Sequence, residues 1–340
     1  MKVLFRERLD QAGKLPRWVL IGVVAVVIAL AGALGIVRAT ATQFDSVKRV
    51  PSVAAVLSRP TVGLENYLLV GSDTRTTADP TDADYKNIGS ADTTGGQRSD
   101  TMMILRYDAT THDVALLSVP RDLWVKIGDS DRSNRLNTAY QVGPEVLIRT
   151  VQRALNIPIH HYLEVDFQGF KGIIDGIGGI DICVKRPARD RHTGLIIRRR
   201  GCSRLGGTQA LAFVRSRFYE SKIDGVWQMD GTSDIGRSTR QRDFVSALLK
   251  GSVKYVSRNP MAAHDVMASF ADSLTVDPSL KLVDMARKLR PAADAGTASY
   301  SLTVVNDVVR DAEVLRLSTK SNDVLAYFAG TGPAPAPAPK

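Results

Sequence analysis

The longest apolar run in the chain lies near its N-terminus. Residues 18–37, WVLIGVVAVVIALAGALGIV, comprise 20 residues without a charge or a proline. A helix of this length is about 30 Å long, which matches the hydrocarbon core of a bilayer, and it lacks the polar face of a surface helix. The pattern therefore predicts a transmembrane helix. A cleaved signal peptide is the alternative, but its apolar core is shorter, about 7–15 residues.

The charges on either side of this run predict its orientation. Five basic residues precede it, and only Arg38 follows closely. Lysine and arginine accumulate on the cytoplasmic side of a membrane, so residues 1–17 are expected to form a cytoplasmic leader and the rest of the chain to lie outside. The leader carries +3 of the total net charge of +10, which leaves +7 outside. A basic domain beside a membrane suits anionic lipids, phosphates or anionic polymers, and its location argues against nucleic acid as a partner.

Beyond a tether at residues 38–62, which includes a short helix at 44–57, strand-like and helix-like patterns alternate. The expected strands are 66–70, 101–107, 114–119, 161–165, 180–184 and 299–305, and the expected helices are 144–155, 167–177, 208–214, 237–254, 261–274 and 279–289. The turn-forming DATTHD at 108–113 joins two strands as a hairpin, whereas helices join the others. The pattern predicts an α/β fold, a mixed-sheet α/β/α sandwich, over residues 63–328. Residues 329–340 are rich in proline and alanine and are expected to form an extended tail that does not pack.

The chain contains two cysteines, Cys183 and Cys202. Outside the cytoplasm such a pair tends to be oxidised. A disulfide here would close a loop of about 20 residues and contribute on the order of 3 kcal/mol in the loop-entropy model; two unpaired buried thiols are the alternative. Residues 186–206 carry seven arginines and are expected to form an exposed loop under this disulfide. The cysteines and histidines do not have the spacing of a metal site.

Arginine and aspartate recur where the expected strands and helices begin or end. The segments are GSDTR at 71–75, RSDT at 98–101, SVPRD at 118–122, RSR at 215–217 and GRSTRQ at 236–241. Ligands of open α/β sheets bind where strand ends meet loops. Clustered guanidinium groups match phosphate oxygens, carboxylates beside them suit Mg²⁺ bound together with phosphate, and a helix start attracts anions. Together the segments predict a site for a pyrophosphate and a metal.

The same residues also fit purely structural roles. Asp73 can bind turn amides, Asp100 can pair with a neighbouring arginine, and Arg121 with Asp122 can form an ion pair. The arginines at 215–217 and 237–240 can belong to solvated faces. Composition and spacing alone leave both interpretations open.

Seven motifs, in this order along the chain, resemble the LytR-CpsA-Psr family. They are NYLLVGSDTR, RSDTMMILRYD, LLSVPRDLWV, RLNTAY, VDFQGFKGIIDGIGGIDICV, GTQALAFVRSR and GRSTRQRDF. The likeness covers about residues 64–256, continues more loosely to about 328, and includes the preceding membrane helix. The arginine-rich segment and the cysteine pair resemble actinobacterial members.

The resemblance implies a phosphotransferase anchored in the cell membrane with its catalytic domain outside. Members transfer a glycopolymer from a polyprenyl-pyrophosphate carrier to peptidoglycan as a phosphodiester. On the matching motifs, Asp73 and Asp100 would bind Mg²⁺ or Mn²⁺. The pyrophosphate would be held by Arg75, Arg98, Arg121, Arg215, Arg217, Arg237, Arg240 and Gln241. Arg98 and Arg121 would be catalytic, and Asp122 or Asp234 is the candidate general base.

The family also implies an apolar tunnel for the prenyl chain. Its candidate residues, each of which also fits a plain core role, are Phe167, Phe170, Ile174, Phe213, Phe244 and Leu248. The actinobacterial likeness suggests an arabinogalactan-type donor. Three other functions compete: a lipid-pyrophosphate phosphatase with the same site, a membrane-bound transcriptional attenuator, and a non-catalytic polymer-binding protein. The attenuator would need a DNA-binding domain, for which residues 1–17 are too short.

Overall fold

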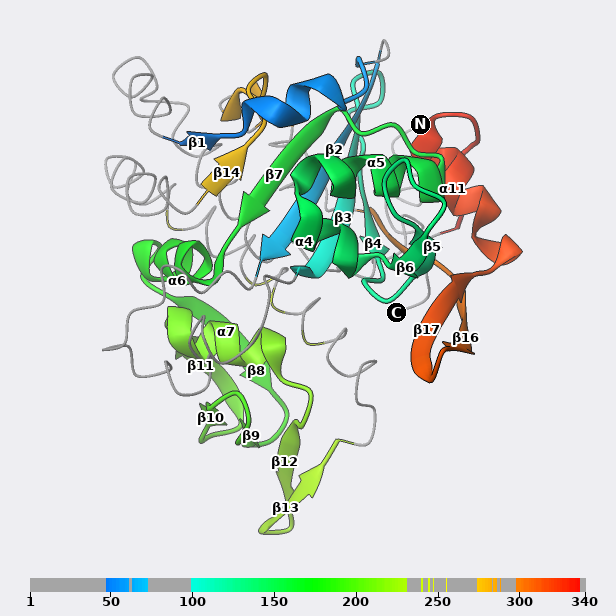
Figure 1. Ribbon diagram of the computed structural model, residues 1–340. Coiled ribbons are helices and arrows are strands. Elements are labelled where there is room, and N and C mark those ends of the chain that lie inside the picture. The colour runs from blue at the N-terminus through cyan, green and yellow to red at the C-terminus, as the bar shows by residue number, and fades with distance from the viewer. Residues whose placement is uncertain are drawn as a thin grey trace, which may run out of the picture.

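The computed structural model describes five segments of the chain and some helical positions between them (Figure 1). The segments are 47–60, 63–72, 99–230, 274–282 and 298–336, and the isolated positions are 240, 244, 247, 255, 284, 285 and 288. Ser99 and Asp100 are described by their backbone alone. The apolar run at 18–37 lies outside the described residues. Among the residues that are described, no helix has the length and apolar character needed to cross a bilayer.

Seven strands form the central mixed sheet, in the order β1-β14-β7-β2-β3-β4-β15. Their bounds are β1 Lys48–Arg49, β14 Leu274–Val276, β7 His161–Val165, β2 Leu64–Ser72, β3 Ser99–Asp108, β4 Val114–Val119 and β15 Ala298–Ser301. β2, β3 and β4 are antiparallel neighbours, whereas β7 runs parallel to β2 and β15 runs parallel to β4. The mixed sheet predicted from the sequence is confirmed.

Two apolar clusters cover the two faces of this sheet. Successive residues of β2 alternate between them, because side chains of a strand point to opposite faces: Leu68 belongs to one cluster and Leu69 to the other. The first cluster packs under η2 (Pro51–Ala55), α4 (Asn137–Val142), α5 (Pro144–Leu155) and α11 (Asn322–Ala329). The second packs under α6 (Phe167–Gly176) and α7 (Gly207–Arg215). Helices therefore cover both faces of the sheet.

A smaller lobe extends beyond α6 and α7 (Figure 1). Its six strands are β8 Ile180–Val184, β9 Ala188–Asp190, β10 Leu195–Ile197, β11 Gly201–Leu205, β12 Glu220–Ile223 and β13 Val226–Met229. β8 pairs with β11, and the other four form a sheet in the order β10-β9-β12-β13. Cys183 and Cys202 face each other across the β8–β11 pair and form the expected disulfide.

The expectation of a loop at 186–206 is wrong, because about half of that segment forms the strands β9, β10 and β11. Ala188, Leu195 and Ile197 are buried in the apolar cluster beside α6 and α7. Exposed arginines at 191 and 198–200 lie among these few buried residues. The high charge of the segment therefore conceals its short strands.

Three further expectations on the N-terminal and C-terminal sides need correction. In place of a helix at 44–57, the described part of the tether forms β1 and the short 3-10 helix η2, which Pro51 begins. Leu274 begins β14 instead of ending a helix, and the rest of 261–274 lies outside the described residues. The strand expected at 299–305 is divided between β15 and β16 (Val304–Val309).

The C-terminal part of the chain is more ordered than its composition suggests. β16 pairs with β17 (Ala312–Leu317) as a hairpin, and α11 follows. One hydrogen bond connects the tail to the domain: the hydroxyl of Tyr300 donates to the carbonyl of Pro335 at 3.3 Å. None of residues 329–336 is buried, and 337–340 lie outside the described residues, so the expectation of a tail that does not pack stays a prediction. A second short hairpin, β5 (Trp124–Lys126) with β6 (Ser133–Arg135), lies against β17 through a bridge between Leu123 and Leu315.

Candidate functional site

Strand ends bring several of the arginine–aspartate segments to one edge of the central sheet. β2 ends at Ser72, which pairs with Ser99 at the start of β3. The register shifts between Gly71 and Ser72, and this bulge leaves Asp100 without a partner on β2. Bulges commonly redirect a side chain next to an active site. Asp100 is thus the irregular position at this edge.

The end of β4 lies at the same edge. Met102 of β3 pairs with Val119, the last residue of β4. Asp100 and Arg121 each lie two residues beyond this pair, so the strand register brings their backbones to neighbouring positions. β7 also ends here, because it runs parallel to β2 and Val165 pairs with Gly71.

Arg215 approaches this edge from α7. Directly after β7, Asp166 caps α6 and accepts a hydrogen bond from the amide of Gly169 at 2.7 Å. Phe167 begins α6, and the guanidinium of Arg215 lies over its ring, 4.7 Å from the centroid. A cation over an aromatic face is attracted by the electrons of the ring. The contact holds the last residue of α7 next to the end of β7.

A hydrogen-bond network fixes the turn that carries Arg215 and Arg217. Ser216 between them is buried; its hydroxyl donates to Oδ2 of Asp190 at 2.7 Å, and the amide of Phe218 donates to the same oxygen at 3.0 Å. Burial raises the pKa of Asp190, but four hydrogen bonds, led by that from Ser216, outweigh it and leave the pKa below its ordinary value. The ionised carboxylate therefore anchors this turn.

Arg240 completes the network from the other side. Its Nη2 donates to the carbonyl of Ser216 at 2.8 Å, its Nη1 pairs with Asp230 at 3.1 Å, and its guanidinium lies 4.3 Å from the ring centre of Tyr219. The side chain is only 8% exposed. These three contacts favour a positioning role for Arg240, which orients the turn of Arg215 and Arg217. Sequence reasoning placed Arg240 among the phosphate-binding residues.

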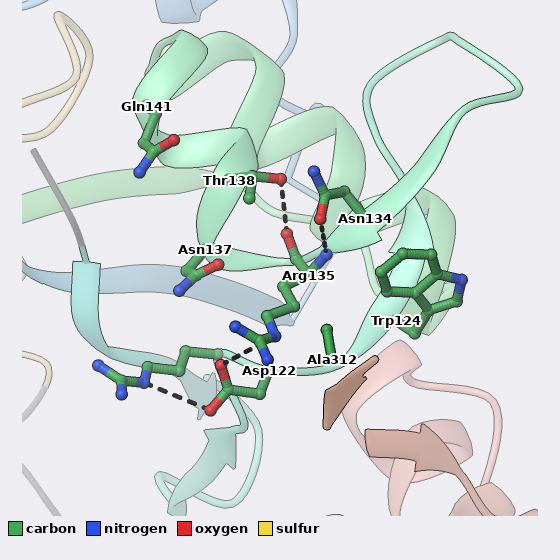
Figure 2. A pocket seen from close by; sticks show the side chains of 9 residues that line it. Asp122, Trp124, Asn134, Arg135, Asn137, Thr138, Gln141 and Ala312 are labelled. Carbon is green, nitrogen blue, oxygen red and sulfur yellow. Dashed lines mark hydrogen bonds and ion pairs between the residues drawn. The ribbon is translucent and has the colours of Figure 1, made fainter. Parts of the chain in front are cut away.

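Arg121 and Asp122 follow the proline at the end of β4. Nε of Arg121 lies 3.4 Å from Oδ2 of Asp122, and Oδ1 of Asp122 lies 3.9 Å from Nε of Arg135. The Asp122 carboxylate thus lies between two guanidinium groups (Figure 2). It is well placed to orient both arginines. Its proposed role as a general base stays a prediction.

A cavity of about 250 Å³ opens beside these charges. It is lined by Arg121, Asp122, Trp124, Asn134, Arg135, Asn137, Thr138, Gln141 and Ala312 (Figure 2). Sequence reasoning identified the first two as site residues and used RLNTAY only as a family motif. The polar residues of α4, Asn137, Thr138 and Gln141, were not predicted as site residues. The sequence signal for them was the group of amide and hydroxyl side chains at the RLNTAY motif.

Comparison with known proteins identifies the family. Residues 37–328 match the LytR_cpsA_psr family. The chain is a LytR-CpsA-Psr protein. A solved LytR-Csp2A-Psr enzyme from Actinomyces oris is similar to it at 27% sequence identity and a TM-score of 0.61, with 83% of this chain and 95% of that chain covered.

Two curated relatives are similar to parts of this LytR-CpsA-Psr protein. It is 31% identical over 258 residues to "Probable cell wall biosynthesis protein LcpB" of Corynebacterium glutamicum, which covers 75% of this chain and 58% of that protein. It is 31% identical over 181 residues to "Polyisoprenyl-teichoic acid--peptidoglycan teichoic acid transferase TagU" of Bacillus mycoides, with 52% of each covered. The chain thus spans little more than half the length of these relatives.

Several predicted site residues of this LytR-CpsA-Psr protein lie outside the described residues. They are Asp73, Arg75, Arg98, Asp234, Arg237 and Gln241. The side chain of Asp100 is likewise not described. In the described part of the chain, no group of three or more His, Cys, Asp and Glu side chains is arranged to hold a metal ion. The metal ligands and these phosphate contacts stay predictions.

The candidates for a prenyl tunnel form part of the core between the sheet and α6–α7. Phe170 and Phe244 are buried, with ring centroids 5.4 Å apart. Ile174 and Phe213 belong to the same cluster, and Phe167 packs against it. Leu248 lies outside the described residues. In the described part of the chain these residues act as a continuous apolar layer, and their role toward a prenyl chain stays a prediction.

Proposed function

We propose that this protein transfers a glycopolymer from a polyprenyl-pyrophosphate carrier to peptidoglycan and forms a phosphodiester. The observation that carries the proposal is the register of the central sheet, which gathers the ends of β2, β3, β4 and β7 at one edge. Arg121 and the Arg215–Arg217 turn adjoin this edge, and arginines are the side chains best suited to bind phosphate. Family membership and the named activity of the Bacillus mycoides relative support the same reaction.

The proposed chemistry is an in-line displacement at phosphorus. A hydroxyl oxygen of the acceptor forms a bond to the phosphorus that carries the polymer, the anhydride bond to the lipid phosphate breaks, and lipid monophosphate leaves. The hydroxyl proton passes to a base or to water. Arg121 and Arg215 would neutralise charge on the phosphoryl and leaving oxygens, which is where such sites lower the barrier. Asp190, Ser216 and Arg240 would hold the second arginine in place.

We further propose that Mg²⁺ or Mn²⁺ binds beside the arginines through Asp73 and Asp100. The bulge places the backbone of Asp100 at the sheet edge next to the end of β4. One or two carboxylates together with phosphate oxygens form the ligand set that Mg²⁺ favours. When bound, the ion would offset the negative charge of the pyrophosphate.

The proposed location is the outer face of the cell membrane, with residues 18–37 as a single span and residues 1–17 inside. This follows from the apolar run and the charges around it,. The named substrate of the Bacillus mycoides relative is a teichoic acid. For this chain we propose an arabinogalactan-type donor on its likeness to actinobacterial members.

The test uses the full chain in detergent with a polyprenyl-pyrophosphate oligosaccharide, Mg²⁺ and a peptidoglycan acceptor. We expect lipid monophosphate and an oligosaccharide–peptidoglycan product in equal amounts. Arg121→Ala should lower the rate at least about 100-fold, as does the loss of one electrostatic donor in other enzymes. Arg204→Ala is the matched control, because Arg204 is half-exposed and pairs with Asp181 in the lobe.

Two outcomes would contradict the proposal. Lipid monophosphate without an oligosaccharide–peptidoglycan product would identify a phosphatase. Binding of the polymer with no turnover would identify a polymer-binding protein.

A further inference from the structure

The cavity beside Arg121 has a lining that the phosphate chemistry does not explain. Four of its side chains are neutral and polar: Asn134, Asn137, Thr138 and Gln141. Trp124 adds a flat apolar face and one N–H donor. Four elements supply the lining, because Trp124 comes from β5, Asn134 from β6, the next residues from α4, and Ala312 from β17. The cavity is thus built by tertiary packing.

Two of these amides are available to a ligand. Asn137 and Gln141 are four residues apart on α4, so they share one face of the helix, and Figure 2 shows both side chains on the same side. Among the described residues, neither side-chain amide has a hydrogen-bond partner, unlike Thr138, which donates to the carbonyl of Arg135 at 2.7 Å. An amide offers two donors and an acceptor.

The charged residues of the cavity form one ion-paired group, in which Nε of Arg135 makes no hydrogen bond within the described part of the chain. Asp122 lies between Arg121 and Arg135, and Nη2 of Arg135 donates to the carbonyl of Glu313 at 2.7 Å. Arg135 therefore ties the β16–β17 hairpin to the wall of the cavity. The wall next to α4 is left neutral, with hydrogen-bonding groups, and Arg121 stands at its border as the residue proposed to contact phosphate.

This combination matches one kind of ligand. A sugar ring carries hydroxyl and acetamido groups that both donate and accept, together with apolar C–H faces. An anionic polymer would require more unpaired cations, and a prenyl chain would require an apolar lining. The volume of about 250 Å³ is below the roughly 300–1,000 Å³ of pockets for drug-sized ligands,, which suits a single ring.

We propose that this cavity binds one sugar ring next to the transferred phosphate, with Asn137 and Gln141 as its hydrogen-bonding residues and Trp124 closing the other side. This inference rests on the proposed transferase function. The ring belongs either to the donor, as the sugar attached to the pyrophosphate, or to the acceptor, as an amino sugar of peptidoglycan. Both carry the same hydrogen-bonding groups, so the experiment has to separate them.

The experiment compares the wild-type full chain with the double variant Asn137→Ala/Gln141→Ala. Two donors are used: polyprenyl pyrophosphate and polyprenyl-pyrophosphate N-acetylglucosamine. If the cavity holds the donor sugar, kcat/KM for lipid monophosphate release falls about tenfold more for the sugar-bearing donor than for the sugar-free one, as expected for two lost hydrogen bonds. If it holds the acceptor sugar, the ratio of transfer to hydrolysis falls about tenfold instead.

The matched control is Val142→Ala, a change to the next residue of α4, whose side chain is 69% exposed and does not line the cavity. It should leave both ratios at their wild-type values. The inference is overturned if the double variant also keeps both ratios. When Gln141 is replaced by asparagine instead of alanine, part of the loss should be recovered, because the amide group is kept on a shorter side chain.

A failure of the transferase function would be recognised separately. If the wild type turns over neither donor, binding of an N-acetylglucosamine trisaccharide is measured by saturation-transfer NMR. If the wild type binds the trisaccharide and the double variant does not, the sugar site is supported and only the transferase function is rejected. No trisaccharide binding by the wild type in that case would overturn the sugar site as well.

Discussion

Replacement of Arg240 by alanine is expected to weaken the fold and the site together. Removing one partner of a buried ion pair costs about 3–5 kcal/mol, but Asp230 is 31% exposed and can regain water, so the lower end applies. The carbonyl of Ser216 also loses its donor, at a cost of roughly 1 kcal/mol,. We therefore expect the free energy of unfolding to fall by about 4 kcal/mol.

Arg240→Lys should recover only part of this stability. An ammonium group can keep the pair with Asp230, but it lacks the planar fork that reaches Ser216 and stacks on Tyr219 at the same time,. Unfolding by urea, followed by tryptophan fluorescence, measures the stability of each variant. Release of lipid monophosphate under conditions where each variant is folded measures the effect on the site. We expect activity to fall in both variants because the turn of Arg215 is no longer held.

Arg189→Ala is the matched control for this prediction. Like Arg240, Arg189 forms both an ion pair, with Glu220, and a contact with an aromatic ring, 4.3 Å from the centre of Trp227. It lies on β9, and neither contact involves the turn of Arg215 and Arg217. It should lose stability and retain activity. The reasoning is refuted if Arg240→Ala has wild-type stability and raises only the KM for the donor, because Arg240 would then contact the substrate.

Three further predictions concern stability. His160 accepts a hydrogen bond from the amide of Asn66, and burial lowers its pKa from 6.5 to about 4; the fold should therefore hold this contribution above pH 6.5 and lose about 3 kcal/mol as the pH falls to 4. Urea titrations at pH 7 and 4 measure the loss, and an equal loss in His160→Gln would contradict the assignment. The double change Cys183→Ser/Cys202→Ser should lower the free energy of unfolding by about 3 kcal/mol,; a midpoint equal to that of the oxidised wild type would exclude this contribution. Arg106→Met should release α11, since the guanidinium binds the carbonyl of Tyr327 and covers its ring; limited proteolysis should then cut near residue 327, and an unchanged cleavage pattern would count against the contact.

The central strands could be predicted because their residues follow simple patterns. β2 and β4 are short apolar runs bounded by turn residues, and the turn between β3 and β4 has a composition that favours a hairpin. The disulfide also followed from the cysteine count and the expected location. These signals come from residues close together in the sequence, so a single sequence is enough to predict the elements.

The lobe and the C-terminal hairpin depend on contacts that the sequence does not display. Leu195 and Ile197 are buried beside α7, a helix that begins ten residues after Ile197, while three arginines follow them directly at 198–200. The hairpin of β16 and β17 is held by Arg135 and by the bridge to Leu123, both distant in the chain. Charge and polarity alone therefore gave the wrong expectation of a loop.

The candidate site was partly visible in the sequence. Arg121 and Arg215 stood out because charges next to buried strands or helices need a reason. Asn137 and Gln141 had no such mark, since amides are common on exposed helix faces and acquire meaning only when β5, β6 and β17 close around them. The motif that contains Arg240 could not show whether its guanidinium points inward, which depends on Asp230 and Tyr219.

The most direct test of the account is a double-mutant cycle on Arg121 and Arg215, with kcat/KM for lipid monophosphate release as the readout. If both guanidinium groups act on one pyrophosphate, each alanine variant should lose at least about 100-fold, and the double variant should lose clearly less than the product of the two, with a coupling above roughly 0.5 kcal/mol. Wild-type rates in either single variant, or losses that multiply within about 0.5 kcal/mol, would show that the two arginines do not share a ligand.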